Sequence, residues 1–360
     1  MVPGPVKVPA EVLEQYGIDY GSADLERDYV ELYDRTEANL QQIMGTQNSI
    51  AIQTGEGMLA LWAALKSCLQ RGNRVLSIAT GLFGFGIGDM ARSIGAHVKI
   101  VGLPYNQTLT DWEAIEKEII AFQPKMITAV HCETPSGTLN PLEQLGRLKK
   151  EYGIPLLYVD AVSSIGGAPV LVDEWHIDLA LGGAQKCLSV PPGMTFLSVS
   201  PQAWEIIDQV NYVGYEALKP YKTAREEFYF PYTPYWHGMA ALHAGTELIL
   251  QEGLQNCFKR HQDVAAYCYK RLAEIGLTLY PASNAVLSPT VSAVNVPENF
   301  TWEELDSRFR QRGLVVGGNY GPLAGKVFRL GHMGSQADRK LMKQALDVIA
   351  SVVKPRKKRS

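Results

Sequence analysis

The chain has 360 residues and a formal net charge of −3. This length allows a large domain plus a smaller one, and this charge gives no electrostatic reason to bind nucleic acid or a membrane. The five cysteines have no CxxC spacing, so the sequence offers neither a zinc site nor a disulfide framework and fits a reducing compartment. There is no apolar signal region at the start and no run of about 18 apolar residues. We therefore expect a soluble cytoplasmic protein without a bound metal.

Short apolar runs alternate with helical patterns through the first two-thirds of the chain. The apolar runs predict strands at residues 74–80, 97–103, 126–133, 155–162, 178–183 and 194–200. Helical spacing predicts helices at 88–96, 111–122 and 142–153, the second with Asp111 as its N-cap. This alternation predicts an α/β fold whose sheet is mostly parallel, with a mixed edge and helices on both faces.

The segment FPYTPYW, residues 230–236, interrupts this pattern. Two long helical stretches follow at 237–253 and 261–276, and then the patterns at 290–296, 301–313 and 327–334 suggest a small α+β domain. We place the large domain, with its N-terminal segment, at residues 1–250 and the small C-terminal domain at 251–353. The remaining residues, 354–360, read KPRKKRS and are expected to be a disordered basic tail.

Two polar residues follow neighbouring predicted strands. Asp160 ends the strand PLLYVD, and Lys186 follows the strand DLALGG within GGAQKCLSV. Ligands of open parallel sheets collect outside the carboxyl ends of the strands, so both side chains are expected at one crevice. A partly desolvated lysine has a lowered pKa and can act as a nucleophile, and a nearby carboxylate can keep a heterocyclic nitrogen protonated. A surface lysine and a helix-capping aspartate would give the same spacing, so the residues alone leave both interpretations open.

The ordered motifs YVDAVSSIGG, GGAQKCLSVPPG and FRLGHMG resemble the class V aminotransferases of fold type I, in particular the alanine–glyoxylate, serine–pyruvate and pyridoxamine–pyruvate group. The resemblance runs from PGPVKVP near the start to FRLGHMG near the end. It implies a large α/β domain with a mostly parallel seven-stranded sheet and a small C-terminal α+β domain. It also implies pyridoxal 5′-phosphate as cofactor and a homodimer, with a tetramer as the alternative.

The resemblance assigns a role to each matching residue. Lys186 would form the Schiff base and move the substrate proton, while Asp160 would pair with the pyridine nitrogen. The others would act as follows: Val162 and Phe83 would pack on the two ring faces, Thr134 would bind the ring hydroxyl, and Arg329 would bind the substrate carboxylate. Each has a plain structural alternative as a core, turn or ion-pairing residue. His131, His332 and Cys187 are left out of the catalytic set as packing or hydrogen-bonding residues.

The cofactor phosphate loop departs from the pattern of most relatives. In QTGEGMLALWAAL, Glu56 replaces a hydroxyl residue before Gly57, and Met58 replaces the next one. A carboxylate repels a phosphate, so Glu56 must turn away, be protonated or meet something else. In FPYTP, Thr233 matches a residue that reaches the neighbouring subunit's phosphate, but Phe230 replaces a tyrosine. Gln185 still offers an amide donor.

These departures leave two reactions open. One moves an amino group to pyruvate or glyoxylate with the phosphorylated cofactor. In the other, unphosphorylated pyridoxamine is itself the amino donor, as in pyridoxamine–pyruvate aminotransferase, whose loop also carries a glutamate. Tyr320, which stands where that enzyme has a second arginine, argues for the first reaction.

Three other classes of protein fit less well. A lyase or desulfurase of this fold would need a mobile catalytic cysteine, and neither Cys257 nor Cys268 is suitably placed. An idle subunit would not need Lys186 and its partners. The stretch GFGIGD, residues 84–89, resembles a nicotinamide fingerprint, but Asp89 stands where its third glycine belongs and no acidic residue ends the next strand.

Overall fold

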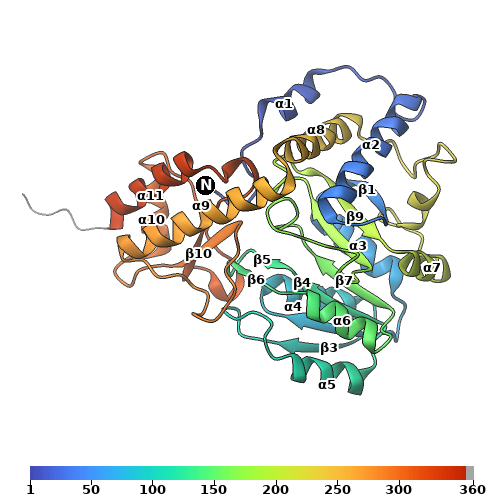
Figure 1. Ribbon diagram of the computed structural model, residues 1–360, viewed down its shortest axis with the longest axis horizontal. Coiled ribbons are helices and arrows are strands. Elements are labelled where there is room, and N and C mark those ends of the chain that lie inside the picture. Colours follow the sequence, from blue (N-terminus) through green and yellow to red (C-terminus); the bar gives the residue numbers. More distant parts are fainter. Residues whose placement is uncertain (354–360) are drawn as a thin grey trace, which may run out of the picture.

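The computed structural model describes residues 1–353, and its centre is one seven-stranded sheet (Figure 1). Along the sheet the strands follow the order β1-β9-β8-β7-β4-β2-β3. Their bounds are β1 Ser49–Gly55, β2 Arg74–Ala79, β3 His97–Gly102, β4 Met126–Val130, β7 Leu156–Asp160, β8 Leu179–Gly183 and β9 Gly193–Val199. The expected α/β fold with a mostly parallel sheet is confirmed.

Only β9 runs against its neighbours in this sheet: it pairs antiparallel with both β1 and β8, and the other pairs are parallel. The antiparallel strand therefore lies one place inside the edge, not at the edge. Since β1 and β8 both oppose β9, they point the same way as β2, β4 and β7. The carboxyl ends of all these strands consequently open at the same edge of the sheet.

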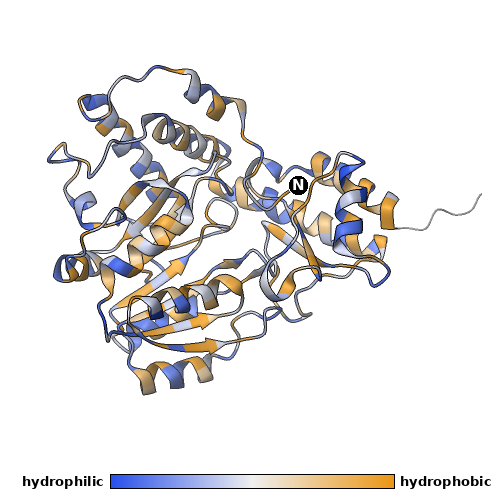
Figure 2. Ribbon diagram, turned by 180° about the vertical axis from the view of Figure 1, so that it is seen from behind, coloured by the Kyte–Doolittle hydropathy of each residue, from blue (hydrophilic) through white to orange (hydrophobic). Residues whose placement is uncertain are grey.

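Helices cover both faces of the sheet. Side chains from α3 (Gly57–Cys68), α4 (Leu82–Ser93) and α7 (Pro201–Val210) share one buried cluster. Those from α2 (Arg27–Met44), α5 (Trp112–Phe122), α6 (Glu143–Glu151) and α8 (Trp236–Glu252) share the other. Figure 2 shows the strands mostly in the hydrophobic colour, while the helices around them mix both kinds of residue. This is the pattern of a sheet that is buried on both sides.

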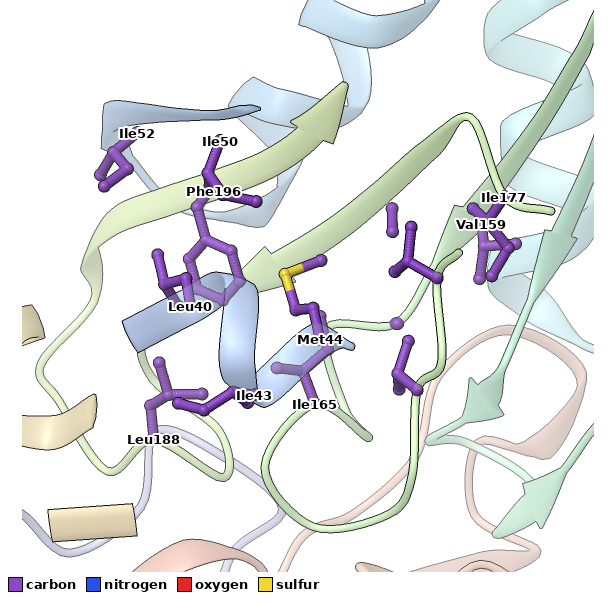
Figure 3. Close-up of a cluster of buried hydrophobic side chains, with 14 of the residues drawn as sticks. Leu40, Ile43, Met44, Ile50, Ile52, Val159, Ile165, Ile177, Leu188 and Phe196 are labelled. Carbon is purple, nitrogen blue, oxygen red and sulfur yellow. The ribbon is translucent and has the colours of Figure 1, made fainter. Parts of the chain in front are cut away.

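One part of this core explains the glycine at position 182, four residues before Lys186. Figure 3 shows Phe196 of β9 packed beside Leu40 and Met44 of α2, and all three are fully buried. A Cβ added to Gly182 would lie 2.1 Å from the ring of Phe196, so only glycine fits there. Burial of a ring of this size contributes about 1.5–3 kcal/mol. Gly182 therefore lets β8 pass close to this ring, while a Cβ on Gly183 would lie 3.2 Å from the side chain of Val162.

The C-terminal part of the chain, here called the C-terminal module, builds a separate small sheet. Strands β10 (Val291–Asn295) and β11 (Val327–Gly331) pair antiparallel. They pack with α9 (Leu254–Ile275), α10 (Trp302–Arg310) and α11 (Arg339–Val353) around their own buried cluster. Between α8 and α9 the helical conformation is interrupted at Gly253, whose φ of +83° suits glycine. The predicted boundary at 250/251 falls in the last turn of α8, and the predicted basic tail lies outside the described residues.

Several element predictions need correction. The helix expected at 88–96 begins earlier, at Leu82, so GFGIGD lies inside α4 instead of in a nucleotide-binding loop. The strand expected at 126–133 divides at His131 into β4 and the short β5 (Cys132–Glu133), which pairs with β6 (Thr138–Leu139). The strand β1 was not expected. At Asp111 the prediction is confirmed, because its Oδ1 accepts a hydrogen bond from the N–H of Ala114 at 3.1 Å and caps α5.

Across residues 1–353, no helix is both long and apolar enough to cross a membrane. The same residues contain no cluster of three His, Cys, Asp or Glu side chains that could hold a metal ion. A short N-terminal helix, α1 (Ala10–Glu14), packs on α8 and connects the first residues of the chain to the large domain.

Candidate active site

A cavity of about 140 Å³ lies where the carboxyl ends of β1, β2, β4, β7 and β8 meet. Ligands of open α/β sheets bind at such an edge. The cavity brings together all the residues predicted for cofactor binding except Thr233. It is lined by Glu56, Gly57, Met58, Leu61, Phe83, Cys132, Thr134, Asp160, Val162, Ser163, Gln185 and Lys186.

Lys186 supplies the amine of this cavity. Its Nζ donates a hydrogen bond to the carbonyl oxygen of Pro3 at 2.7 Å. Burial lowers the pKa of Lys186, and the positive charge of Arg329 lowers it further. The neutral, nucleophilic amine is therefore more populated near neutral pH than in an exposed lysine.

Asp160 supplies a buried carboxylate at the end of β7. The N–H of Val162 donates a hydrogen bond to its Oδ1 at 3.0 Å. Among residues 1–353, its Oδ2 has no hydrogen-bond partner. Burial raises the pKa of Asp160 to about 6, although the N–H of Val162 and the charge of Lys186 oppose this rise. A carboxylate whose ionisation is held back by burial gains from a cationic partner, such as a protonated ring nitrogen.

The other walls fit a flat heteroaromatic ring with polar substituents. Phe83 and Val162, both partly buried, pack against the same hydrophobic cluster. Thr134 and Ser163 share a hydrogen bond of 2.6 Å between their hydroxyl oxygens. The side-chain oxygen of Gln185 is buried and has no hydrogen-bond partner among the described residues. Such an orphaned polar atom beside a lysine and a carboxylate suits a polar ligand, so the cavity fits a vitamin B6 ring.

Glu133 is a functional candidate that the sequence analysis did not single out. Its fully buried carboxylate accepts hydrogen bonds from the N–H groups of Gly84 at 2.8 Å and Phe83 at 3.2 Å, at the start of α4. It thereby replaces the missing side-chain cap of this helix and fixes the backbone of Phe83. Burial raises the pKa of Glu133 to about 7, and the charge of Asp160 contributes to the rise.

This raised pKa predicts how stability changes with pH. The folded protein holds the proton of Glu133 more tightly than the unfolded chain, so this carboxyl costs stability as the pH rises towards 7. We expect the melting temperature of Glu133→Gln minus that of wild type to become more positive from pH 5 to pH 8. Calorimetry of both proteins without cofactor measures this difference. Glu143→Gln, at an exposed position, is the control. A difference that does not change with pH would contradict the prediction.

Glu56 lies at the N-terminus of α3, where the phosphate group of a cofactor is expected. Its Oε1 accepts a hydrogen bond from the N–H of Met58 at 3.1 Å, so the carboxylate caps the helix. Exposed backbone N–H groups at such a helix end are the usual partners of a phosphate. The Glu56 carboxylate therefore occupies a hydrogen-bonding position at the N-terminus of α3 that a phosphate oxygen would otherwise take.

Arg329 lies on β11, close to this cavity but outside its lining. Its buried side chain donates from Nε to the carbonyl oxygen of Gly318 at 2.8 Å, and its guanidinium stacks 4.5 Å from the ring centre of Tyr320. No residue in 1–353 pairs with its two terminal nitrogens. A planar guanidinium held this way presents two parallel donors to a carboxylate.

The remaining residues of the sequence analysis take structural positions. His131 contacts Ser164 at 2.9 Å, and His332 contacts Ser292 at 2.8 Å. Burial lowers the pKa of both histidines to about 4, which keeps them neutral. Cys187 is buried beside the lysine, and burial raises the pKa of its thiol. None of these side chains lines the cavity.

Thr233 is exposed and does not reach the cavity of its own chain. Phe230 packs edge-on against Tyr29, with ring centres 5.2 Å apart, so it serves the core. Leu61, Cys132 and Ser163 line the cavity without having been predicted. Ser163 follows the predicted Val162 within YVDAVSSIGG, and Cys132 lies two positions before the predicted Thr134; this proximity was the available signal.

A lysine of lowered pKa and a buried carboxylate, at the carboxyl ends of a mostly parallel sheet with a small C-terminal module, define a fold-type I aminotransferase. Comparison with known proteins agrees. The family described as aminotransferase class-V matches residues 5–325. The chain belongs to the class V aminotransferases, a family of enzymes that in general depend on pyridoxal 5′-phosphate.

Individual relatives cover almost the whole chain. An aminotransferase of Methanocaldococcus jannaschii is 34% identical over 95% of this chain and 89% of its own length. The pyridoxamine–pyruvate transaminase of Mesorhizobium japonicum is 32% identical over 93% of this chain and 86% of its own. The crystal structure of an alanine–glyoxylate aminotransferase from Nostoc sp. superimposes with a TM-score of 0.93 at 30% identity, covering 98% of this chain and 94% of that one.

Proposed function

We propose that the enzyme moves an amino group to a small 2-oxo acid, pyruvate or glyoxylate, with pyridoxal 5′-phosphate as cofactor. The observation that carries this proposal is the pairing of Lys186 and Asp160 in one cavity, an amine nucleophile and a ring-nitrogen partner, with the guanidinium of Arg329 close to the lysine as a carboxylate clamp. The names of the alanine–glyoxylate and pyridoxamine–pyruvate relatives support small 2-oxo acids as acceptors.

Each residue has a defined task in this proposal. The bound cofactor supplies an aldehyde that captures amines and a pyridinium ring that withdraws electrons. Lys186 would hold the cofactor through its aldehyde, with loss of water, and its free amine would take up a proton from the substrate α-carbon. Asp160 keeps the ring nitrogen protonated, and Arg329 orients the substrate through its carboxylate. The other lining residues would hold the cofactor as follows: Phe83 and Val162 would pack on the ring, Thr134 would bind the ring hydroxyl, and Gly57, Met58 and Gln185 would bind the 5′ substituent.

A second candidate reaction uses unphosphorylated pyridoxamine as the amino donor. The observation in its favour is the carboxylate of Glu56 on the N-terminus of α3. That carboxylate can accept a hydrogen bond from a free hydroxymethyl group, whereas it repels a phosphate by about 4 kcal/mol at 4 Å with an effective dielectric constant near 20. Solvent at this exposed position reduces the repulsion.

Substitution of Glu56 separates the two reactions. In Glu56→Ser we expect the affinity for pyridoxal 5′-phosphate, relative to pyridoxal, to rise about 10- to 100-fold, because a negative charge leaves the helix N-terminus. Equilibrium titration of both compounds into both proteins measures this ratio. Asp111→Ser removes a carboxylate that caps α5 and does not line the cavity, and is the matched control.

The outcomes are distinct. Wild-type protein that binds pyridoxal and transfers nitrogen from pyridoxamine to pyruvate supports the second reaction. Tight binding of the phosphate by wild type, with no change in Glu56→Ser, rules it out and leaves the first reaction. Failure of wild type to transfer nitrogen to either pyruvate or glyoxylate would contradict both.

The proposal includes a homodimer, or a tetramer built from such dimers, and a cytoplasmic location. An exposed Thr233 is free to complete the site of a partner subunit. Tyr215, an exposed aromatic residue, stacks on the neighbouring Tyr232 with ring centres 4.4 Å apart, and Val213 and Tyr229 are exposed as well. A sedimentation measurement of mass tests the assembly. All five cysteines are unpaired and buried, which suits a reducing compartment.

A further inference from the structure

The first eight residues, here called the N-terminal strap, run from the C-terminal module to the lysine of the site. At one end, the N–H of Gly331 in β11 donates to the carbonyl oxygen of Met1 at 3.0 Å, and Gln336 donates to that of Val2 at 2.8 Å. At the other end, the N–H of Val6 donates to the carbonyl oxygen of Gln185 at 3.3 Å. Figure 1 shows the N-terminus beside the C-terminal module, while α1 lies over the large domain.

Between these anchors the strap touches Lys186. Nζ of Lys186 donates to the carbonyl oxygen of Pro3 at 2.7 Å, and this is its one hydrogen bond within residues 1–353. A Cβ on Gly4 would lie 2.6 Å from Cδ and 2.8 Å from Nζ of the lysine, and the φ of Gly4 is +93°. Gly4 therefore lets the strap come close enough for Pro3 to meet the amine.

The C-terminal module is shaped to admit the strap. A Cβ on Gly317 would lie 2.7 Å from Pro3, and one on Gly331 would lie 2.2 Å from the carbonyl oxygen of Val2. Gly317 also pairs through its backbone with Arg329, at 2.7 Å from the N–H of Arg329 to the carbonyl oxygen of Gly317. The N-terminal strap, which contacts Lys186, is thus fixed against β11, the strand that carries Arg329.

We propose that the Pro3 carbonyl receives the ε-amine of Lys186 whenever the amine is released from the cofactor, and positions it for proton transfer. This inference rests on the proposed function. A carbonyl oxygen suits this task because it orients the amine without carrying a full negative charge. A carboxylate at the same place would stabilise the ammonium form, which cannot accept a proton. Pro3 is therefore a positioning residue that acts through Lys186.

The first test replaces Gly4 with alanine. We expect Gly4→Ala to slow the single-turnover reaction with an amino donor by about 10- to 100-fold, because the Cβ occupies the position of the released lysine. The deuterium isotope effect at the substrate α-carbon should rise as well, since proton transfer becomes more strongly rate-limiting. Gly72→Ala is the matched control, with a φ of +86° at the glycine and no atom within 4 Å of the added Cβ.

A second measurement needs no variant. Amide hydrogen exchange of residues 2–8 is compared in wild-type protein between the lysine-linked form and the amino form, which both hold the cofactor. We expect exchange to be about 2- to 10-fold slower in the amino form, where the freed lysine binds Pro3 again, as one hydrogen bond would give.

These results separate the strap from the proposed function. Equal exchange in the two forms, or a Gly4→Ala half-reaction as fast as that of Gly72→Ala, would overturn the role of Pro3. Wild-type protein in which borohydride attaches no cofactor to Lys186 would overturn the proposed function, and the positioning role with it.

Discussion

Lys186→Ala is expected to lose covalent capture of the B6 aldehyde and to reduce amino transfer by at least about 10³-fold. The alanine removes both the nucleophile and the group that moves the α-proton, and a positioned acid–base group alone contributes about 10²- to 10⁴-fold. Borohydride reduction followed by peptide mass analysis measures the capture, and a coupled assay for the 2-oxo acid product measures transfer.

Lys125→Ala is the control for this experiment. Lys125 is also partly buried and burial also lowers its pKa, but it hydrogen-bonds Asn73 at 3.2 Å, away from the cavity. It should keep the borohydride label and the activity. A label on another lysine in wild type, or normal transfer by Lys186→Ala, would refute the assignment of the nucleophile.

Arg329→Gln is expected to lower kcat/KM for the 2-oxo acid by about 10²- to 10³-fold. The substitution removes the buried guanidinium that we propose binds the substrate carboxylate, and loss of one partner of a buried charge pair typically costs about 3–4 kcal/mol. Capture of the cofactor by Lys186 should persist, because Arg329 does not line that cavity. Steady-state kinetics with pyruvate and glyoxylate measure the loss.

Two controls separate recognition from folding. Arg312→Gln changes an exposed arginine of the same module, which bonds only the carbonyl oxygen of Arg308 among the described residues, and should leave kcat/KM unchanged. A small aldehyde without a carboxylate should react equally with wild type and Arg329→Gln. An equal loss for both kinds of acceptor would show that Arg329 supports the fold instead of binding the carboxylate.

The strand ends were the part of the site that the sequence predicted well. Asp160 and Lys186 follow apolar runs that can be identified as buried strands with little ambiguity. A parallel sheet brings the carboxyl ends of such strands to one edge. The strand β1 was missed because Gln53, a polar residue, lies buried in it, where its amide donates to the carbonyl oxygen of Glu216 at 3.2 Å. That compensating contact comes from far along the chain and leaves no local signal.

Long-range contacts also explain the other gaps. The earlier start of α4 depends on its cap by Glu133, which comes from a different strand. The contact between Pro3 and Lys186 joins residues that are 183 positions apart in the sequence. Periodicity and spacing report only neighbours along the chain, so neither contact could be derived from them.

The helix interruption at Gly253 and the N-terminal strap together limit how the C-terminal module can move relative to the large domain. The described chain passes between the C-terminal module and the large domain at these two places. A module connected to the rest of the chain at two points rotates most easily about the axis that passes through both connections. Because the strap is bonded to β11 at one end and contacts Lys186 at the other, we expect the amine and the guanidinium of Arg329 to keep their separation when the C-terminal module moves.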